Sequence, residues 1–362
     1  MNEIHDSKKA YLVLSNGSVY EGIRIGSERD SVGELVFTTG MTGYLETLTD
    51  PSYCGQIVMQ TFPLIGNYGV ISPDFEGRTA VKGYVVREMC EVPSNFRSEG
   101  ELEKFLIEND IPGICGIDTR EITRIIREEG VMNAKICSEV PSDLSEITSY
   151  AVTKAVATVS AKEQEVYPAE GEKKYRVALM DYGAKKNIIR CLQQRGCEVT
   201  CFPQDTKAED VLAMNPDGIM LSNGPGDPEE NVVPIAELKK LIGKVPIFGI
   251  CLGHQLTALA MGGKTMKLKY GHRGANQPVK DLIGGRTYIT SQNHGYAVVS
   301  DSLEGVGRVT FINANDQSCE GMEYPDKNCF TVQFHPEACG GPRDTAFLFD
   351  RFIKMMGGEQ DA

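Results

Sequence analysis

The sequence predicts a two-part α/β protein. A mixed α/β N-terminal domain covers 1–150, a linker covers 151–172, and a C-terminal domain over 173–362 holds a mostly parallel central sheet flanked by helices. Three observations predict this organisation. The 362-residue chain is longer than one hydrophobic core normally supports. Residues 139–172 are rich in Ser, Glu, Ala and Lys, as solvated linkers are. Beyond them, continuous apolar runs alternate with helical segments.

The first domain opens with a β-hairpin over 10–25, because two β-rich runs flank an Asn-Gly turn. The best-marked helix covers 118–130. Asp118 is placed as its N-cap, Glu121 completes a capping box, and Gly130 ends it. The other predicted elements are short β segments at 33–40, 56–62 and 131–136 and a helix at 101–110.

The second domain is predicted as a parallel sheet, because its apolar runs are short, continuous and separated by helices. An antiparallel region and a closing amphipathic helix follow. The predicted strands are 175–180, 218–221, 245–250, 264–268, 286–291, 296–300, 307–313 and 329–334, and the helices are 184–195, 206–214, 229–242 and 344–356.

Composition narrows the class of protein. With 41% hydrophobic and 24% charged residues, the chain has the balance of a soluble globular protein. A formal net charge of −13 argues against nucleic-acid binding. No stretch reaches the roughly 18 apolar residues of a membrane span. The eleven cysteines are odd in number, scattered and without a C-x-x-C pair, which predicts free thiols and a cytoplasmic location.

Cys251 is the candidate nucleophile. It lies in "FGICLGH", between an apolar strand and a helix, with Gly249 and Gly253 two positions to either side. A strand that enters a helix through so tight a turn strains the turn residue and leaves no room for side chains at −2 and +2. The helix N-terminus favours the thiolate. The alternative is a buried structural cysteine, which is the commoner case for this residue type.

The candidate base is His335. The neighbouring His254 lies in the first turn of the helix that follows Cys251, so the elbow directs the sulfur away from it. His335 instead ends a β-rich run, and Glu337, on the same face of an extended chain, is placed to orient its ring. Strand ends are where open α/β sheets place their sites. The alternative is a capping histidine before Pro336.

Two loops supply candidate binding groups. The Gly- and Pro-rich loop 221–230 follows an apolar strand, and its amides, with that of Leu252, are placed to stabilise an oxyanion. Asn293, Gly295 and Tyr296 in "SQNHGYAV" are candidates for binding a polar substrate. Taken alone, the first loop is better explained as an ordinary tight turn, and the second motif is a weak signal.

Neither a nucleotide nor a metal site is predicted in this chain. The segment "GGKT" at 262–265 lacks the first glycine of a phosphate-binding loop, where Ala258 stands. Cys197 and Cys201 share a strand face but have no second ligand pair for zinc.

Four ordered motifs together resemble the class I glutamine amidotransferase family over about 173–357. They are "SNGPGDP", "GICLGHQ", "SQNHGYAV" and "FHPE". The N-terminal half resembles one branch, the small, glutamine-hydrolysing subunits of carbamoyl-phosphate synthase, through 33–69 and 116–130. The resemblance implies the fold of a class I amidotransferase domain behind a first domain that contacts the partner.

The resemblance also implies roles for individual residues. Cys251 is the nucleophile, His335 the acid and base, and Glu337 the orienting carboxylate. The chain departs from the family pattern at Gly40, where serine is frequent, and at Tyr296, where phenylalanine is common. The implied L-glutamine-binding residues are Ser52, Gly224, Gly226, Leu252, Gln255, Asn293, Gly295 and Tyr296.

The implied activity is hydrolysis of L-glutamine through a γ-glutamyl thioester. The ammonia would pass to a large synthetase subunit, which uses ATP, Mg²⁺ and bicarbonate to make carbamoyl phosphate for arginine and pyrimidine synthesis. This chain would need no cofactor of its own and would form a heterodimer or a larger assembly. Two other functions remain open at this point: a free-standing amidase or γ-glutamyl hydrolase, and a non-catalytic scaffold subunit.

Overall fold

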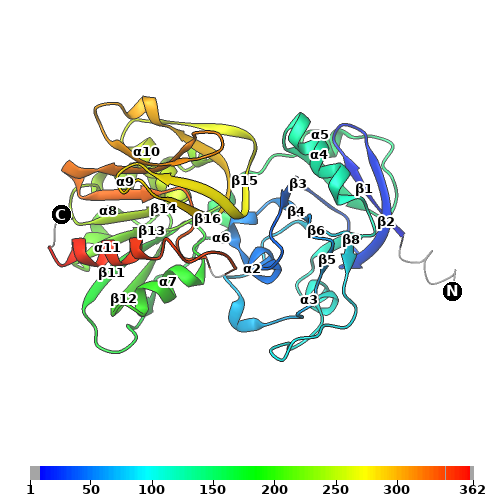
Figure 1. Cartoon of the computed structure of the whole chain (residues 1–362), viewed down its shortest axis with the longest axis horizontal. Coiled ribbons are helices and arrows are strands. Elements are labelled where there is room, and N and C mark those ends of the chain that lie inside the picture. Colours follow the sequence, from blue (N-terminus) through cyan, green and yellow to red (C-terminus); the bar gives the residue numbers. More distant parts are fainter. Residues whose placement is uncertain (1–8, 339, 359–362) are drawn as a thin grey trace. The chain divides into compact units, whose positions relative to one another are not determined.

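The computed structural model describes residues 9–338 and 340–358. The chain forms two compact units, Met1–Thr153 and Lys154–Ala362, whose elements Figure 1 labels. The α/β class predicted from the sequence is confirmed, since both units combine helices with sheets. Within the described residues no helix is both long and apolar enough to cross a membrane.

The segment predicted as a linker contains regular structure. Helix α6 (Ala155–Val159) lies in it, and Val156 packs into the apolar core of the second unit. Strand β10 (Glu165–Tyr167) pairs with β12 (Cys197–Pro203) at the edge of that unit's sheet. The apolar residues of α6 and β10 are too few to form a periodic pattern. Their conformation is decided by the core and the sheet that they join.

The strands of the first unit close into a barrel in the order β1-β2-β8-β6-β4-β3-β9. Closure removes the unpaired strand edges that an open sheet exposes. The sequence predicted β segments here but not their closure, because strand pairing joins residues far apart in the chain. The barrel strands are β1 (Lys9–Leu14), β2 (Val19–Gly26), β3 (Ser31–Thr38), β4 (Gln56–Gln60), β6 (Gly83–Val85), β8 (Pro112–Cys115) and β9 (Met132–Cys137).

The predicted hairpin and the capped helix of this unit are present. Strands β1 and β2 pair antiparallel around the predicted turn, where Gly17 has φ 91°. Helix α4 (Thr119–Glu129) begins after Asp118, whose carboxylate accepts hydrogen bonds from two amides of the first turn, and it ends at Gly130 with φ 101°. The remaining elements are α2 (Tyr44–Thr49), η1 (Pro51–Tyr53), β5 (Leu64–Ile65), η2 (Ser72–Asp74), β7 (Glu88–Met89), α3 (Leu102–Glu108) and α5 (Ser145–Thr148).

The second unit is built on a sheet with the order β10-β12-β11-β13-β14-β19-β18-β16-β15-β17. Its central strands, from β12 to β19 in that order, run parallel, as the continuous apolar runs predicted. The strands on either side pair antiparallel. The strands not yet bounded are β11 (Tyr175–Asp181), β13 (Gly218–Leu221), β14 (Ile247–Ile250), β15 (Lys264–Asp281), β16 (Thr287–Val299), β17 (Arg308–Asn313), β18 (Cys319–Tyr324) and β19 (Cys329–Val332).

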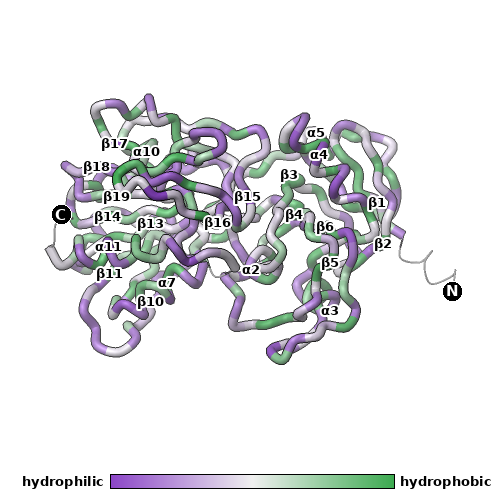
Figure 2. The backbone as a smooth tube through the Cα atoms, viewed as in Figure 1, coloured by the Kyte–Doolittle hydropathy of each residue, from purple (hydrophilic) through white to green (hydrophobic). Residues whose placement is uncertain are grey.

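Helices cover both faces of the parallel strands. Successive strand residues face opposite sides of a sheet. In β11, Ala178 and Met180 belong to the core formed with α8, α9 and α10, whereas Val177 and Leu179 belong to the core formed with α7 and α11. Burial on both sides explains the hydrophobic stretches of β13 and β14 in Figure 2. The elements are α7 (Lys186–Gln193), α8 (Ala208–Ala213), η3 (Pro228–Glu230), α9 (Val232–Leu241), α10 (Leu252–Ala260), η4 (Ser300–Leu303), η5 (Pro325–Lys327) and α11 (Phe347–Met356).

The antiparallel part is more extensive than predicted. Strands β15 and β16 form a long pair with register shifts after Lys267 and Gly274, where three short segments were expected. Strand β18 was not predicted, because Glu320 and Gly321 interrupt its apolar pattern. Pairing with two neighbours decides the conformation of this strand, which its own composition leaves undecided.

Replacing Phe248 by alanine should destabilise the second unit by about 3–5 kcal/mol. The fully buried Phe248 ring stacks on Phe330 at 4.4 Å and meets Phe349 edge-on at 5.5 Å, so truncation leaves a cavity. Because the chain has no Trp, urea unfolding is followed by circular dichroism. The control is Val232→Ala, at a residue that is 70% exposed on α9, with an expected change within about 0.5 kcal/mol. Equal midpoints for the two variants would contradict the assignment of this core.

Candidate active site

Four neighbouring parallel strands deliver the candidate site to one edge of the sheet. The segments that follow the carboxyl ends of β11, β13, β14 and β19 carry Lys185, Asn223, Cys251 and His335. All four side chains are buried. Because the carboxyl ends of parallel strands lie at the same edge, residues far apart in the chain meet in one place, where open α/β sheets place their sites.

Cys251 occupies a strained turn between β14 and α10. Its φ of 52° and ψ of −102° lie outside the regions that ordinary residues prefer, which is the strain predicted from the flanking glycines. A Cβ on Gly249 would lie 2.9 Å from Thr331, and one on Gly253 would lie 2.6 Å from the Leu221 carbonyl. The glycines therefore let the strand and helix pack closely around the cysteine.

His335 and Glu337 form a buried ion pair beside the cysteine. The ring Nδ1 lies 2.6 Å from Glu337 Oε1, although the chain turns after His335 and is not extended there as the prediction assumed. Lys185 Nζ lies 3.3 Å from the same ring nitrogen and 3.5 Å from the carboxylate. The ring Nε2 has no hydrogen-bond partner within 3.5 Å among the described residues, and a contact with the Cys251 thiol acts on the His335 pKa.

The charges and the burial around His335 and Glu337 explain the shifts in their pKa values. Burial and the Lys185 ammonium act to lower the pKa of His335, but the Glu337 carboxylate and the thiol contact outweigh them and hold it above its usual range. Burial acts to raise the pKa of Glu337, and the two cations beside it hold it below its usual range. The side chain that orients the ring thus stays ionised.

His254 does not serve Cys251, as expected from the direction of the turn. Its Nδ1 lies 2.8 Å from Thr331 Oγ1 on β19, and burial lowers its pKa to about 3. The next residue, Gln255, donates from Nε2 to the Tyr296 carbonyl at 2.9 Å and to Gln333 Oε1 at 3.0 Å. Gln255 thereby joins α10 to β16 and to the end of β19.

The loop after β13 is held against the turn of Cys251. The Gly253 amide donates to the Ser222 carbonyl at 3.0 Å, and a Cβ on Gly224 would lie 2.7 Å from the Leu252 side chain. Asn223 accepts a bond from the Lys185 amide at 3.0 Å. The Leu252 amide belongs to the first turn of a helix, where amides have no intrahelical acceptor. Gly226, with φ 85°, lies further along the loop.

Strand β16 brings the third predicted motif to Cys251. The thiol lies 3.7 Å from the Asn293 carbonyl, and the Tyr296 carbonyl accepts the bond from Gln255. Gly295 lies between these two residues. The motif therefore borders the cysteine through its backbone.

Ser52 lies in the first unit, and its contacts are given within that unit. It is buried in η1, and its amide donates to the carboxylate of Asp50 at 2.9 Å. Its predicted contact with glutamine stays a prediction. Gly40, the departure noted above, lies beyond the end of β3 in the same unit and is half-buried.

Sequence reasoning missed Lys185. It follows β11 in "DYGAKKN", and the rule that sites lie at the carboxyl ends of parallel strands would have drawn attention to it. Only its contact with His335 reveals a role. Asn187 on the same segment donates to the Glu337 carbonyl and supports that residue.

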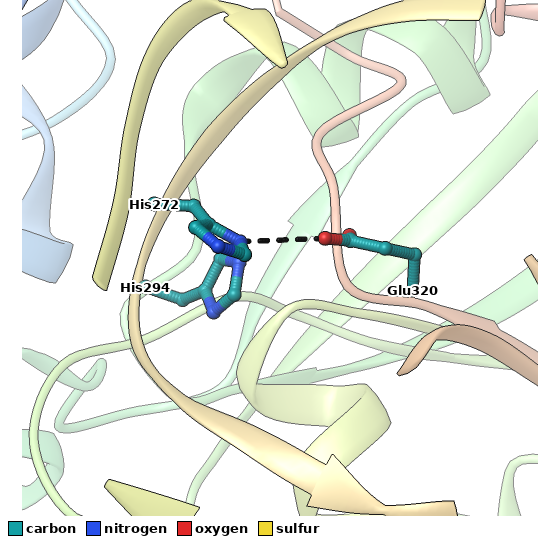
Figure 3. A group of neighbouring side chains, drawn as sticks. All are labelled: His272, His294 and Glu320. Atoms are coloured by element: carbon teal, nitrogen blue, oxygen red, sulfur yellow. Dashed lines mark ion pairs between the residues drawn. The ribbon is translucent and has the colours of Figure 1, made fainter. Parts of the chain in front are cut away.

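A second group, His272, His294 and Glu320, was also missed. In Figure 3 the two rings lie close together and the carboxylate points toward His272. Their ligand atoms all lie within 4.8 Å, which is close enough to hold a metal ion, although no metal site was predicted. The residues come from β15, β16 and β18, so no local spacing marks them.

Comparison with known proteins points to one family. The family model described as glutamine amidotransferase class-I matches residues 178–355, and the model of the carbamoyl-phosphate synthase small chain, CPSase domain, matches residues 12–136. The carbamoyl phosphate synthase small chain of Clostridium perfringens is 51% identical over 352 residues, covering 96% of this chain and 99% of the relative. That of Listeria monocytogenes is 50% identical over 359 residues and covers 98% of each.

Among solved structures, a putative GMP synthase subunit from Thermoplasma acidophilum is 23% identical, with a TM-score of 0.46. It covers 52% of this chain and 96% of its own.

Two substitutions should move the pKa of His335 in opposite directions. Glu337→Gln removes the anion and leaves burial and Lys185, which both act to lower the pKa. Lys185→Met removes a cation and should raise the pKa. Each change should be about 1–3 pH units. An NMR titration of the histidine rings measures both, and His254 serves as the internal control because it should not titrate near neutral pH. Shifts of the same sign would contradict this account of the charges.

Proposed function

Because the chain belongs to the family of carbamoyl-phosphate synthase small chains, which carry a class I glutamine amidotransferase domain, we propose that it hydrolyses L-glutamine through Cys251, His335 and Glu337. The observation that carries the proposal is the buried His335–Glu337 pair at 2.6 Å beside the strained Cys251 turn. A nucleophile, a base and an orienting carboxylate in this order are the parts that acyl transfer needs.

The reaction begins with attack of the Cys251 sulfur on the side-chain amide carbon of glutamine. Because Glu337 holds the pKa of His335 above its usual range, the ring carries the thiol proton as an imidazolium before the attack. The amides of Leu252 and of the Gly224–Gly226 loop stabilise the tetrahedral oxyanion. As the C–N bond breaks, His335 returns the proton to the leaving nitrogen, which releases ammonia and forms a γ-glutamyl thioester.

Water then completes the reaction. His335 takes a proton from the attacking water, the C–S bond breaks, and the proton returns to the sulfur, which releases glutamate. Glu337 stays ionised throughout and stabilises the imidazolium in both halves, while Lys185 keeps that carboxylate anionic. The proposed glutamine contacts are Ser52, Gly224, Gly226, Leu252, Gln255, Asn293, Gly295 and Tyr296.

The product ammonia implies a partner. Released into water at neutral pH, ammonia would take up a proton and lose its nucleophilic lone pair, so it must reach its acceptor along an enclosed path. The names of the relatives support a partnership with a large synthetase subunit. In this proposal the large subunit binds ATP and Mg²⁺ and makes carbamoyl phosphate for arginine and pyrimidine synthesis. The scattered cysteines favour a cytoplasmic location for the proposed heterodimer.

Cys251→Ala should remove glutamine-dependent carbamoyl phosphate synthesis by the two-subunit complex, with a loss of at least about 10³-fold. Synthesis from added ammonia should remain, because that reaction bypasses the thioester. Cys90→Ala, at a cysteine of the first unit, is the matched control and should leave both rates unchanged. Loss of both activities in Cys251→Ala would contradict the role proposed for this residue.

Glutaminase activity of the purified chain should rise when the large subunit is added. A rate of glutamine hydrolysis that does not change when the large subunit is added would instead favour a free-standing amidase or γ-glutamyl hydrolase. Failure of Cys251 to react with a glutamine-analogue alkylating agent would favour a non-catalytic scaffold.

A further inference from the structure

Buried polar side chains of β16 and β18 form a hydrogen-bonded chain that the proposed reaction does not use. Glu320 is fully buried on β18, and its Oε2 accepts a bond from Gln292 Nε2 at 3.0 Å. Gln292 Oε1 lies 3.0 Å from His294 Nε2. His294 Nδ1 lies 2.7 Å from the Tyr296 carbonyl, which also accepts the bond from Gln255. We call this path from Glu320 through Gln292 and His294 to Tyr296 the relay.

The orientation of the Gln292 amide is determined by its surroundings. Its Nε2 donates to the Glu320 carboxylate and, at 3.2 Å, to Thr290 Oγ1, whose hydroxyl donates to the Gln277 carbonyl at 2.9 Å. The amide oxygen therefore faces His294. In this arrangement both nitrogens of the His294 ring face acceptor oxygens, which fits a ring with a proton on each nitrogen and Glu320 as the counter-charge.

A second proton state is also consistent with the geometry. Burial and the neighbouring cations act to lower the pKa of His294, and burial raises the pKa of Glu320. If Glu320 takes up the proton, Gln292 turns its amide over and donates to an unprotonated His294 Nε2, and the Thr290 hydroxyl turns from the Gln277 carbonyl to the Gln292 amide oxygen. In both states Nδ1 keeps its proton, because a carbonyl oxygen at 2.7 Å can only accept.

We propose that Glu320 is a positioning residue that acts through Gln292 to hold the His294 ring in place, with its Nδ1 proton bonded to the Tyr296 carbonyl. This carbonyl fixes the Gln255 amide, and the same β16 segment contacts the Cys251 thiol through Asn293. The relay thus supports the wall on which glutamine is proposed to bind, and its kinetic consequence rests on the proposed function.

Hydrogen bonds account for the donor atoms that also suggested a metal site. Glu320 Oε1 accepts a bond from Asn313 Nδ2 at 3.1 Å and lies 3.4 Å from His272 Nδ1. The other nitrogen of that ring lies 2.9 Å from Asp316. A metal bound to His294 Nε2 would break the bond to Gln292, so the relay and a metal centre exclude each other.

The first test measures the protonation of the His294 ring directly. In the chain labelled with ¹⁵N-histidine, long-range ¹H–¹⁵N spectra should show a proton on His294 Nδ1, and His294→Asn assigns the signal. Glu320→Leu and Gln292→Met should loosen the ring and change the signal of His294 Nε2, because the partner of that nitrogen is no longer held in place. A His294 ring protonated only at Nε2, or spectra unchanged in both variants, would overturn the proposal. So would one zinc per purified chain that Glu320→Leu removes. None of these results depends on glutaminase activity.

Glu320→Gln supplies a matched rescue. Asn313 Oδ1 accepts a bond from the Asn315 amide at 2.9 Å, so its NH₂ group must face residue 320 and hold the new amide oxygen. The new NH₂ group then faces Gln292, turns it over and preserves the proton on His294 Nδ1. This variant should therefore keep the proton on His294 Nδ1 and the bond between residue 320 and Gln292, although the buried charge and the proton on Nε2 are gone.

The second test is kinetic, on the two-subunit complex. Glu320→Leu and Gln292→Met should raise KM for glutamine about tenfold, the effect of about one hydrogen bond, and leave kcat within about threefold. Glu320→Gln and the control Asp316→Asn should match the wild type. Co-purification with the large subunit and an unchanged circular dichroism spectrum show that each variant folds. An unaltered KM in Glu320→Leu would overturn the proposal, whereas a wild-type complex inactive with glutamine would instead contradict the proposed function.

Discussion

The strained backbone of Cys251 is the constraint on which the site depends. A φ of 52° at a non-glycine residue costs on the order of 1–3 kcal/mol and persists only when its surroundings impose it. Those surroundings are β14, held between two parallel strands, and α10, packed so closely that Gly253 has no room for a Cβ. The sheet and helix therefore maintain a turn that the local chain would not adopt by itself.

Around this turn the protein buries charged side chains. Burying a charged side chain is favourable only when it contacts a side chain of opposite charge. Taking a carboxylate, an imidazolium and an ammonium out of water is costly, and their mutual attraction offsets this cost when the geometry is close. Lys185, His335 and Glu337 lie within 2.6–3.5 Å of one another, which satisfies that condition. The arrangement keeps the orienting carboxylate ionised and raises the pKa of the histidine, both of which suit a proton carrier.

Much of the fold and of the candidate site could be predicted from the sequence, because the relevant signals lie in short stretches of the chain. The Asn-Gly hairpin and the Asp118 cap reflect interactions within a few residues, and the apolar parallel strands and the glycines around Cys251 are recognisable from their own short stretches of sequence. Barrel closure, strand β18, and the joining of β10 and α6 to the second unit could not be predicted in this way. Each depends on partners far along the chain, and the composition of these segments is ambiguous without them.

The same distinction holds within the site. The sequence by itself determined which residues have the chemistry: a cysteine in a forced turn, a histidine and glutamate at i and i+2, and a glycine-rich loop. Only the tertiary structure decided that Lys185 joins His335, that His254 turns to Thr331, and that Glu320 reaches β16 through Gln292. The reason is that side-chain contacts across a sheet are set by strand order and register, which no short stretch of sequence encodes.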